Sequence, residues 1–340
     1  MDFFGLDIGT HSIKIAQLEH QKDGYHLAAF GSGPSTGKGL LSEAESDLIA
    51  LAEAIKSLCR EAKIKTKNVA TALPQDLVFT RIVTVPKLSE EELISSLKWE
   101  AEQFIPIPLS EVTLAHQVVG QIKDGQKERN KVFMVAAPNR LIDKVLKVLE
   151  TAELTPVSLE TEIISMARSL VKPDGDTAML VDFGAKATDL AVADNGQVVL
   201  VHSLGIAGET LTKALVTQLG LESSQAEAYK RAYGADPAKL EGKLLQTIGP
   251  ILEKITVEME KTIQFYQTSS GQKKISRIIL TGGAAGLPEI AALLTKKLNL
   301  EIQLGDPFVQ IKKDGLETKI PSGKAFIFAV AVGLAMKKIE

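Results

Sequence analysis

The chain has 340 residues, 45% of them hydrophobic, and a formal net charge of −3. This length is too great for one ordinary hydrophobic core, so we expect two lobes or domains, and the small net charge gives no reason to expect a nucleic-acid partner. The single cysteine cannot form an internal disulfide, which fits a reducing cytoplasm. No run reaches about 18 uninterrupted apolar residues, so we expect no membrane span.

The first predicted element is a short apolar strand in FFGLDIGTHSIK that ends in Asp7-x-Gly9. A corner of small residues follows, then an alternating strand, the turn dipeptide Asp23-Gly24 and a third strand. Asp-Gly tolerates positive φ and therefore predicts a tight hairpin. Backbone amides at such a corner point outward and form an anion nest, so this unit is a candidate phosphate site.

The glycine-rich stretch GSGPSTGKG, residues 31–39, invites comparison with the P-loop pattern G-x-x-x-x-G-K-[ST]. Ser32 stands where the first glycine should be, and Gly39 stands where the Mg²⁺-binding hydroxyl should be. Because two fixed positions fail, we interpret the stretch as a loop that only connects the third strand to a helix starting at Ser42 with a capping box. We expect Lys38 to be dispensable for nucleotide binding.

Residues 81–153 show the pattern of an inserted α+β module. Ser89 and Glu92 match a capping box, an apolar stripe at helical spacing follows, and the helix must end before Pro106. A later strand and an amphipathic helix complete the module. We interpret Trp99 as a core or half-buried aromatic rather than a ligand contact.

A second strand–hairpin–strand unit lies in AMLVDFGAKATDLAVADNGQVVLVHSLGIAG, with Asp182-x-Gly184 and the turn dipeptide Asn195-Gly196. Its order matches the first unit, and such a repeat predicts two related lobes that face one another. Two anion nests would then grip a polyphosphate from both sides, with Asp7 and Asp182 holding Mg²⁺ through water. On the residues alone, two unrelated hairpins remain the alternative.

A third motif follows a buried strand at residues 278–280. The strand runs into Thr281-Gly282-Gly283, and a helix is predicted to begin near Pro288. A glycine pair after a strand lets a flat ligand approach the backbone closely, although an ordinary strand–helix loop has the same pattern.

With these three motifs in order, the chain resembles the actin-like ATPase superfamily, which includes actin, sugar kinases, Hsp70 chaperones, MreB and FtsA. LDIGTHSIK resembles its first phosphate motif, LVDFGAKATDLAV its second and ILTGGAAGLPEI its adenosine motif. TEIISMARSL and GKAFIFAVAVGLAM resemble its two connecting helices. Within the superfamily, VPKLSEEELISSLKWEAEQFIPIPLSEV is similar to a motif of the PilM family of type IV pilus assembly proteins.

The resemblance implies an α/β fold class: a two-lobed actin-like ATPase fold of duplicated ribonuclease-H-like domains with an FtsA-type 1C α+β insertion. Lobe 1 (subdomain 1A) is expected at residues 1–80, 154–176 and 323–340. The inserted subdomain 1C is expected at 81–153, and lobe 2 (subdomains 2A and 2B) at 177–322.

The resemblance also implies ATP and Mg²⁺ as cofactors. Asp7 and Asp182 match the expected metal ligands. Glu162 matches the catalytic position that orients the attacking water, although a helix-surface carboxylate is an equal alternative. The residues expected to bind the nucleotide are Asp7, Gly9, Thr10, Lys14, Gly184, Ala185, Lys186, Thr188, Gly208, Glu209, Thr210, Glu227, Lys230, Gly282, Gly283 and Ala284.

Some of these assignments have simpler alternatives. Lys14 could be a solvated lysine on an edge strand, and Glu227 and Lys230, three apart on one helical face, could be an ordinary ion pair. The chain also departs from the superfamily pattern: Lys186 and His11 stand where small residues are usual. We interpret His11 as a loop residue rather than a metal ligand.

For function, the resemblance implies an ATP-binding cytoplasmic scaffold of the type IV pilus machinery with at most slow ATPase activity. The implied partner is the N-terminal cytoplasmic tail of a PilN-like inner-membrane protein. By the same resemblance, this tail packs between lobe 1 and the insertion, against the stretch from Ala72 to Arg81.

Further expectations concern other partners and location. Other inner-membrane pilus components, the assembly motor and a second copy of the chain are additional expected partners, whereas nucleic acid and direct membrane insertion are not expected. The protein would be recruited to the inner membrane face through its partner.

Two rival functions stay open. An FtsA-like division protein would form filaments and attach to the membrane, but we expect no membrane-binding helix after the buried-helix pattern at residues 325–336. A sugar or acetate kinase would need a substrate-binding insertion with a catalytic aspartate, and we find no such pattern.

Overall fold

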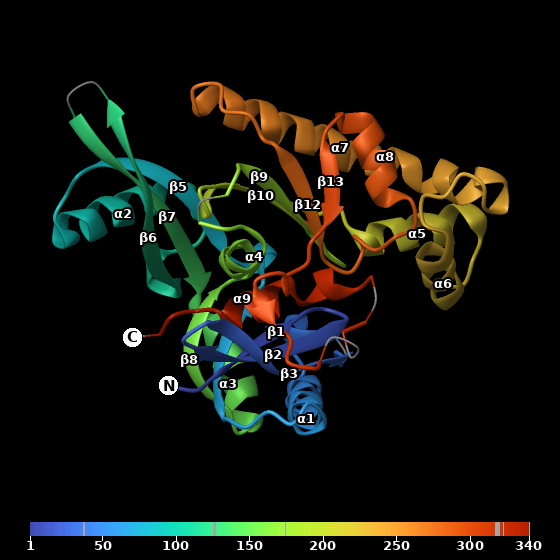
Figure 1. The fold of residues 1–340 in the computed structure, drawn as a ribbon, viewed down its shortest axis with the longest axis horizontal. Helices are drawn as coiled ribbons and strands as arrows, with labels where there is room; N and C mark the ends of the chain where they lie inside the picture. Colours follow the sequence, from blue (N-terminus) through green and yellow to red (C-terminus); the bar gives the residue numbers. More distant parts are fainter. Residues whose placement is uncertain (37, 125–126, 174, 317–319, 322, 340) are drawn as a thin grey trace.

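The computed structural model describes residues 1–36, 38–124, 127–173, 175–316, 320–321 and 323–339. Its strands form three sheets, with the orders β14-β3-β2-β1-β4-β8, β11-β10-β9-β12-β13 and β5-β7-β6 (Figure 1). The strands span Phe4–Ile8 (β1), Ser12–Gln21 (β2), Gly24–Pro34 (β3), Asn68–Leu73 (β4), Phe79–Pro86 (β5), Val112–Asp124 (β6), Lys127–Pro138 (β7), Thr155–Thr161 (β8), Ala178–Phe183 (β9), Thr188–Asp194 (β10), Gln197–Leu204 (β11), Arg277–Thr281 (β12), Glu301–Leu304 (β13) and Ile311–Lys312 (β14).

The helices cover these sheets and join the lobes. The α-helices span Glu45–Glu61 (α1), Glu90–Phe104 (α2), Asn139–Thr151 (α3), Glu162–Leu170 (α4), Gly208–Leu219 (α5), Ser223–Tyr233 (α6), Lys243–Ser269 (α7), Ile290–Leu298 (α8) and Ala329–Ala335 (α9). Short 3₁₀ turns occupy Gly39–Leu41 (η1), Gln75–Leu77 (η2), Leu109–Glu111 (η3), Leu240–Gly242 (η4) and Ala325–Phe328 (η6). Within the described ranges, no helix is both long and apolar enough to cross a membrane.

The predicted repeat is present in the structure. In the first sheet β1 pairs with β2 in antiparallel and with β4 in parallel orientation, and β2 continues into β3 through a hairpin. In the second sheet β9, β10, β12 and β11 take the same places in the same orientations. The order β3-β2-β1-β4-β8 therefore matches β11-β10-β9-β12-β13, as expected for two lobes of one design.

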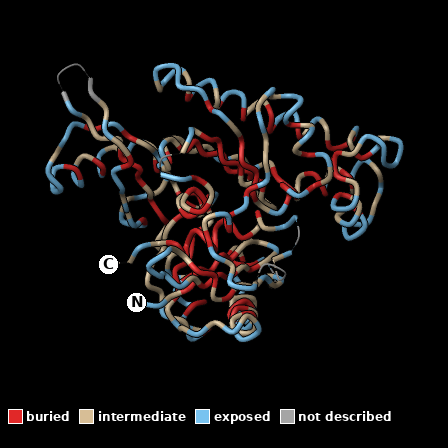
Figure 2. Tube along the Cα trace, viewed as in Figure 1, coloured by how far each residue is buried: buried red, intermediate tan, exposed pale blue. Residues whose placement is uncertain are grey.

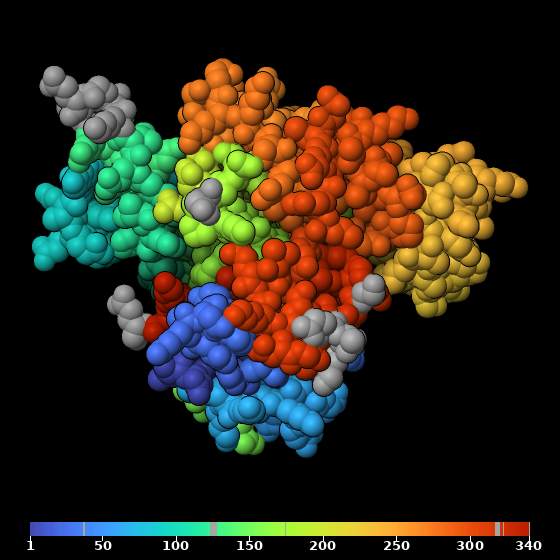
Figure 3. Space-filling view, viewed as in Figure 1, coloured from blue at the N-terminus to red at the C-terminus, as the bar shows by residue number. Residues whose placement is uncertain are grey.

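Each lobe buries its own apolar layer, which Figure 2 shows in red at the centre of the two halves. In lobe 1, α1 and α3 pack on the sheet through residues such as Ile55 and Val145, both fully buried. In lobe 2, α5, α7 and α8 cover one face of the second sheet with residues such as Leu211, Ile255 and Leu294. The end of the chain, orange-red to red in Figure 3, lies between the two lobes on the face shown.

Helix α1 begins at Glu45, so the expected start at Ser42 is wrong. The Ser42 hydroxyl accepts a hydrogen bond from the Ala44 backbone N–H at 3.2 Å and donates one to Asp47 at 2.6 Å. Ser42 is the residue that caps the end of η1, so these bonds lie in the turn between η1 and α1.

The two connecting helices, α4 and α9, cross between the lobes. Gly333 lets them approach, since a Cβ on this residue would lie 1.8 Å from the Ser165 carbonyl oxygen. The Arg168 guanidinium donates to the Gly333 carbonyl at 2.6 Å and pairs with Glu160 at 2.7 Å. The crossing is thus fixed by close backbone contact and by a partly buried arginine.

The inserted sheet has its own core beneath α2. The capping box of Ser89 and Glu92 is confirmed, and Leu93, Leu97 and Ala101 face the sheet. Trp99 lies on the opposite side of the helix and is 63% exposed, so its interpretation as a core or half-buried aromatic is wrong.

Two elements pack in lobe 1, although the predicted segment boundaries assigned them to other units. Helix α3, at the end of 81–153, packs in the lobe 1 core, and β14, within 177–322, extends the lobe 1 sheet beside β3. The segment boundaries of the three units stay a prediction.

Candidate functional site

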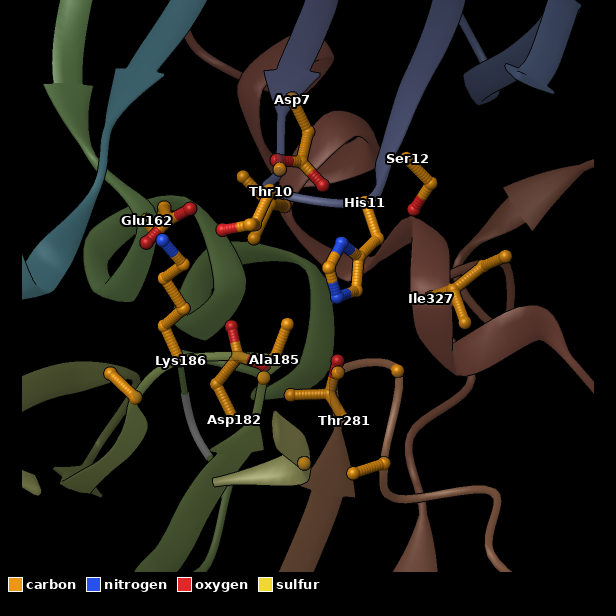
Figure 4. Close-up of a pocket in the computed structure, with 18 of the residues that line it drawn as sticks. Asp7, Thr10, His11, Ser12, Glu162, Asp182, Ala185, Lys186, Thr281 and Ile327 are labelled. Atoms are coloured by element: carbon orange, nitrogen blue, oxygen red, sulfur yellow. The ribbon is translucent and has the colours of Figure 1, made fainter. Parts of the chain in front are cut away.

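A cleft of about 560 Å³ opens between the lobes and is lined by both of them. Figure 4 shows side chains from the two repeated corners pointing into it. The predicted site residues that line it are Asp7, Gly9, Thr10, Lys14, Glu162, Asp182, Gly184, Ala185, Lys186, Gly208, Glu209, Glu227, Lys230, Gly282, Gly283 and Ala284. Residues distant in sequence therefore meet in one place.

The two corners have the same backbone geometry. The Gly9 N–H donates to the Ser12 carbonyl at 3.1 Å, and the Gly184 N–H donates to the Ala187 carbonyl at 3.0 Å. A Cβ on either glycine would lie 2.9 Å from that same carbonyl oxygen. Glycine is thus required at both corners by close approach, and the repeat extends to atomic detail.

Lys14 sits beside Asp7, at 3.1 Å, and its side chain is only 14% exposed. Burial opposes its charge, but Asp7, with smaller contributions from Asp182 and Glu162, outweighs burial and raises the pKa of Lys14. The alternative of a solvated edge lysine is therefore wrong: Lys14 is a half-buried, charged residue in the cleft.

Other carboxyl groups lie near the Lys14–Asp7 pair. Burial and the nearby Asp7 raise the pKa of Asp182 to about 6. Burial, followed by the charges of Asp7 and Asp182, raises the pKa of Glu162 well above its ordinary value. The alternative of a helix-surface carboxylate is thus wrong for Glu162, which begins α4 inside the cleft.

Asp189 belongs to this acidic group, although sequence reasoning missed it. It lines the cleft, is 5% exposed, and its Oδ1 has no hydrogen-bond partner in the described structure. Burial raises its pKa to about 7. The signal was its place in the repeat, directly across the hairpin from Asp182.

The acidic group would suit a cation that is coordinated both by carboxylates and by a bound phosphate ligand. Among the described residues, no three His, Cys, Asp or Glu side chains are grouped closely enough to hold a metal ion. Mg²⁺ commonly keeps several waters and binds one or two carboxylates together with substrate phosphates. Asp7 and Asp182 supply such a pair, one from each lobe.

Lys230 anchors the second lobe's side of the cleft. Its Nζ donates to Glu227 at 2.6 Å, to the Thr212 hydroxyl at 2.8 Å and to the Gly208 carbonyl at 3.0 Å. The ordinary ion pair of Glu227 and Lys230 is thus present, and both residues also line the cleft. The bond to Gly208 ties α6 to the first residue of α5.

Two predicted binding residues, Thr188 and Thr210, do not line the cleft. Thr188 is fully buried and donates its hydroxyl to the Ile206 carbonyl at 2.7 Å. The Thr210 hydroxyl accepts from the Ala207 N–H at 3.1 Å at the start of α5. Both side chains are occupied in holding loops that carry the neighbouring cleft residues.

The loop after β3 reaches the cleft, so the interpretation that residues 31–39 only connect is wrong. Lys38 lines the cleft together with Leu40 and Leu41. The hairpin register pairs Ser12 with Pro34, which returns the loop to the first corner. Whether Lys38 is dispensable for nucleotide binding stays a prediction.

The two residues that depart from the superfamily pattern both project into the cleft. His11 lies 3.3 Å from Glu209 of the other lobe, so its imidazole bridges the lobes. The Lys186 side chain extends toward Glu162 in Figure 4. The cleft thus accommodates the larger side chains of both His11 and Lys186.

Comparisons with known proteins agree with this architecture. The ethanolamine utilization protein EutJ from Carboxydothermus hydrogenoformans covers 98% of this chain and 88% of its own with a TM-score of 0.59 at 15% identity. MreB5 of Spiroplasma citri bound to AMPPNP covers 97% and 94% with a TM-score of 0.51 at 14% identity. Two lobes of repeated strand order around one cleft, joined by two crossing helices, thus define an actin-like ATPase fold, as expected.

The family is shown by the sequence. The family model for type IV pilus assembly protein PilM matches residues 5–339, and the chain belongs to this family. A structure titled PilM-PilN type IV pilus biogenesis complex covers 100% of this chain and 99% of its own, at 29% identity and a TM-score of 0.84. Cell division protein FtsA is more distant, at 22% identity in Enterococcus hirae and 23% in Pseudomonas aeruginosa, over 90% and 99% of this chain and 78% and 89% of theirs.

Proposed function

We propose that this protein binds ATP with Mg²⁺ in the cleft between its lobes and works as a scaffold of the type IV pilus machinery that holds the cytoplasmic tail of a PilN-like membrane protein. The observation that carries the nucleotide part is the repeat itself. It sets two identical glycine corners, each beside an aspartate, on either side of one cleft.

The residues present fit ATP and Mg²⁺. The corner amides near Thr10 and Ala185 would face phosphates, as anion nests do, and Lys14 would supply positive charge to them. Asp7 and Asp182 would hold the metal through its waters. Gly282 and Gly283 would let the adenosine part lie against the backbone.

Hydrolysis would be slow in this arrangement. Glu162 would orient the attacking water, but burial and neighbouring carboxylates raise its pKa well above the ordinary value. A raised pKa lowers the fraction of this carboxyl group that is ionised and able to accept a proton from water. We therefore propose that ATP chiefly fixes the angle between the lobes.

The partner proposal rests on the likeness to the PilM-PilN complex, which spans the whole chain at 29% identity. We propose that the tail lies between lobe 1 and the inserted subdomain, against the stretch from Ala72 to Arg81. The protein would then be cytoplasmic and held at the inner membrane face by this partner.

Calorimetry with a synthetic PilN-like tail peptide tests the scaffold role. The peptide should bind with a stoichiometry of one, and a scrambled peptide of the same composition should give no heat. The absence of peptide binding both with and without Mg·ATP would overturn the proposal.

A further inference from the structure

One wall of the cleft is also the entrance to the inserted subdomain. Pro74, Asp76 and Leu77 line the cleft, and β5, the first strand of the insertion, begins at Phe79. The short turn η2 therefore belongs to the cleft on one side and leads directly into the inserted sheet on the other.

Glu162 is bonded directly to this turn. The backbone N–H of Gln75 donates to the Glu162 Oε2 at 2.9 Å. Glu162 is also the first residue of α4, one of the two helices that cross between the lobes. Because a hydrogen bond weakens steeply with distance and angle, a ligand that moves the Glu162 carboxylate must move η2 or break this bond.

Gln75 passes this constraint to β5. Gln75 is 2% exposed, and its Nε2 donates to the Thr80 hydroxyl at 2.9 Å. Its Oε1 is buried without a hydrogen-bond partner in the described structure, which is unfavourable for stability. Leucine would fill similar space without an orphaned acceptor, so packing alone does not account for a glutamine here.

We propose that Gln75 is a positioning residue that couples the cleft to the inserted subdomain, through the path Glu162–Gln75–Thr80. This inference rests on the proposed function, since it requires both a nucleotide and a tail peptide to bind. Coupling between two sites is reciprocal. Nucleotide should therefore change the affinity for the tail peptide by the same factor by which the peptide changes the affinity for nucleotide.

A second route between the lobes is visible and provides the alternative. Val119 and Phe133 of the inserted sheet pack with Ala193 and Val198 of lobe 2. Closing the lobes would also move the insertion through this apolar contact. The two routes make different predictions for substitutions in η2 and β5.

The experiment measures the peptide Kd without and with saturating Mg·ATP and takes the ratio. This ratio cancels any direct contribution of a residue to either binding event. The variants are Gln75→Leu and Thr80→Val, which each remove one side of the Gln75–Thr80 bond at nearly constant volume. Thr84→Val, an exposed position on the same strand, is the matched control.

We expect a ratio of at least about fivefold, in either direction, for the unaltered protein and Thr84→Val. Gln75 and Thr80 lie within the stretch proposed to contact the tail, so the peptide Kd itself can change in Gln75→Leu and Thr80→Val. For both variants we expect the ratio of the two Kd values to fall within about twofold of one. Thermal unfolding checks that each variant is folded.

If the unaltered protein binds both ligands but shows a ratio within twofold of one, the coupling is absent and the inference fails. If the ratio survives in both variants, the coupling does not depend on the Gln75–Thr80 bond and the inference also fails. If the unaltered protein binds neither ligand, the proposed function itself fails.

Discussion

Lys14 and Asp189 occupy the same position in the two copies of the repeated sheet. Lys14 lies opposite Asp7 in the β1–β2 hairpin, and Asp189 lies opposite Asp182 in the β9–β10 hairpin. The first copy neutralises its aspartate with an ion pair of 3.1 Å, whereas the second places a second carboxyl group there. The second lobe's side of the cleft therefore holds two facing carboxyl groups, whose raised pKa values mean that ionising both is unfavourable. A bound cation would favour their ionised forms.

Asp189 should destabilise the ligand-free protein at high pH. Its pKa is raised by burial to about 7 from an ordinary 3.8, so the folded state keeps a proton that the unfolded chain releases. Stability should therefore fall as pH rises from about 4 to 7. Asp189→Asn should increase the free energy of unfolding by about 2–4 kcal/mol at pH 8 and by little at pH 4.

Urea unfolding of both proteins at the two pH values measures this difference. Equal stabilisation at pH 4 and pH 8 would show that Asp189 does not titrate as described.

Glu227 should behave in the opposite way. Burial alone would raise its pKa, but hydrogen bonds from Lys230, Thr212 and Arg231 lower it to about 2. This stabilisation is present above the ordinary pKa of 4.5 and is lost as pH falls toward 2. The Glu227 side chain is 31% exposed, so Glu227→Gln should lose only about 1 kcal/mol at pH 7.

The difference between Glu227→Gln and the unaltered protein should shrink below pH 4. Glu260→Gln, at an exposed position of α7, is the control and should change stability little at either pH. A Glu227→Gln effect that is independent of pH would contradict the ion-pair explanation.

The α4–α9 crossing should not tolerate a side chain at Gly333. A Cβ there would lie 1.8 Å from the Ser165 carbonyl oxygen, so Gly333→Ala should lose at least about 2 kcal/mol of stability. Gly249→Ala in α7, where a Cβ meets no atom within 4 Å, should be neutral or stabilising by up to about 1 kcal/mol. Chemical denaturation compares the two, and equal effects would show that the helices do not cross so closely.

Substitutions on the two faces of α2 should differ in their effect on stability, measured by the same chemical denaturation. Leu97 is 3% exposed beneath the helix, so Leu97→Ala should lose about 2–5 kcal/mol. Trp99 is 63% exposed, so Trp99→Ala should change stability by less than about 0.5 kcal/mol. A large loss from the tryptophan variant would place that side chain in a core.

Sequence patterns predicted the elements whose signals are local. Both predicted hairpins formed. Asn195 and Gly196 both have positive φ, as the dipeptide predicts. In the first hairpin Gln21 pairs with Gly24, so the central turn residues are Lys22 and Asp23 rather than Asp23 and Gly24. Periodicity likewise defined α2, and it could have placed Trp99 outside, because two residues beyond Leu97 is roughly the opposite side of a helix.

The misjudged parts depend on tertiary register. Lys38 reaches the cleft because β3 runs back along β2 to the first corner, and no local motif shows this. Asp189 lies outside the Asp-x-Gly motif and enters the site only through its pairing with Asp182. Thr188 and Thr210 flank the site, but their hydroxyl groups hold the backbone of residues 206 and 207 instead.

The most direct test of the nucleotide site is a calorimetric titration with ATP in the presence of Mg²⁺, in EDTA, and with Asp182→Ala. The account predicts one ATP bound per chain, and at least about tenfold weaker binding both in EDTA and in the variant, with the thermal unfolding of Asp182→Ala showing a folded protein. The contradicting result is either no binding of ATP or an affinity that neither EDTA nor Asp182→Ala changes.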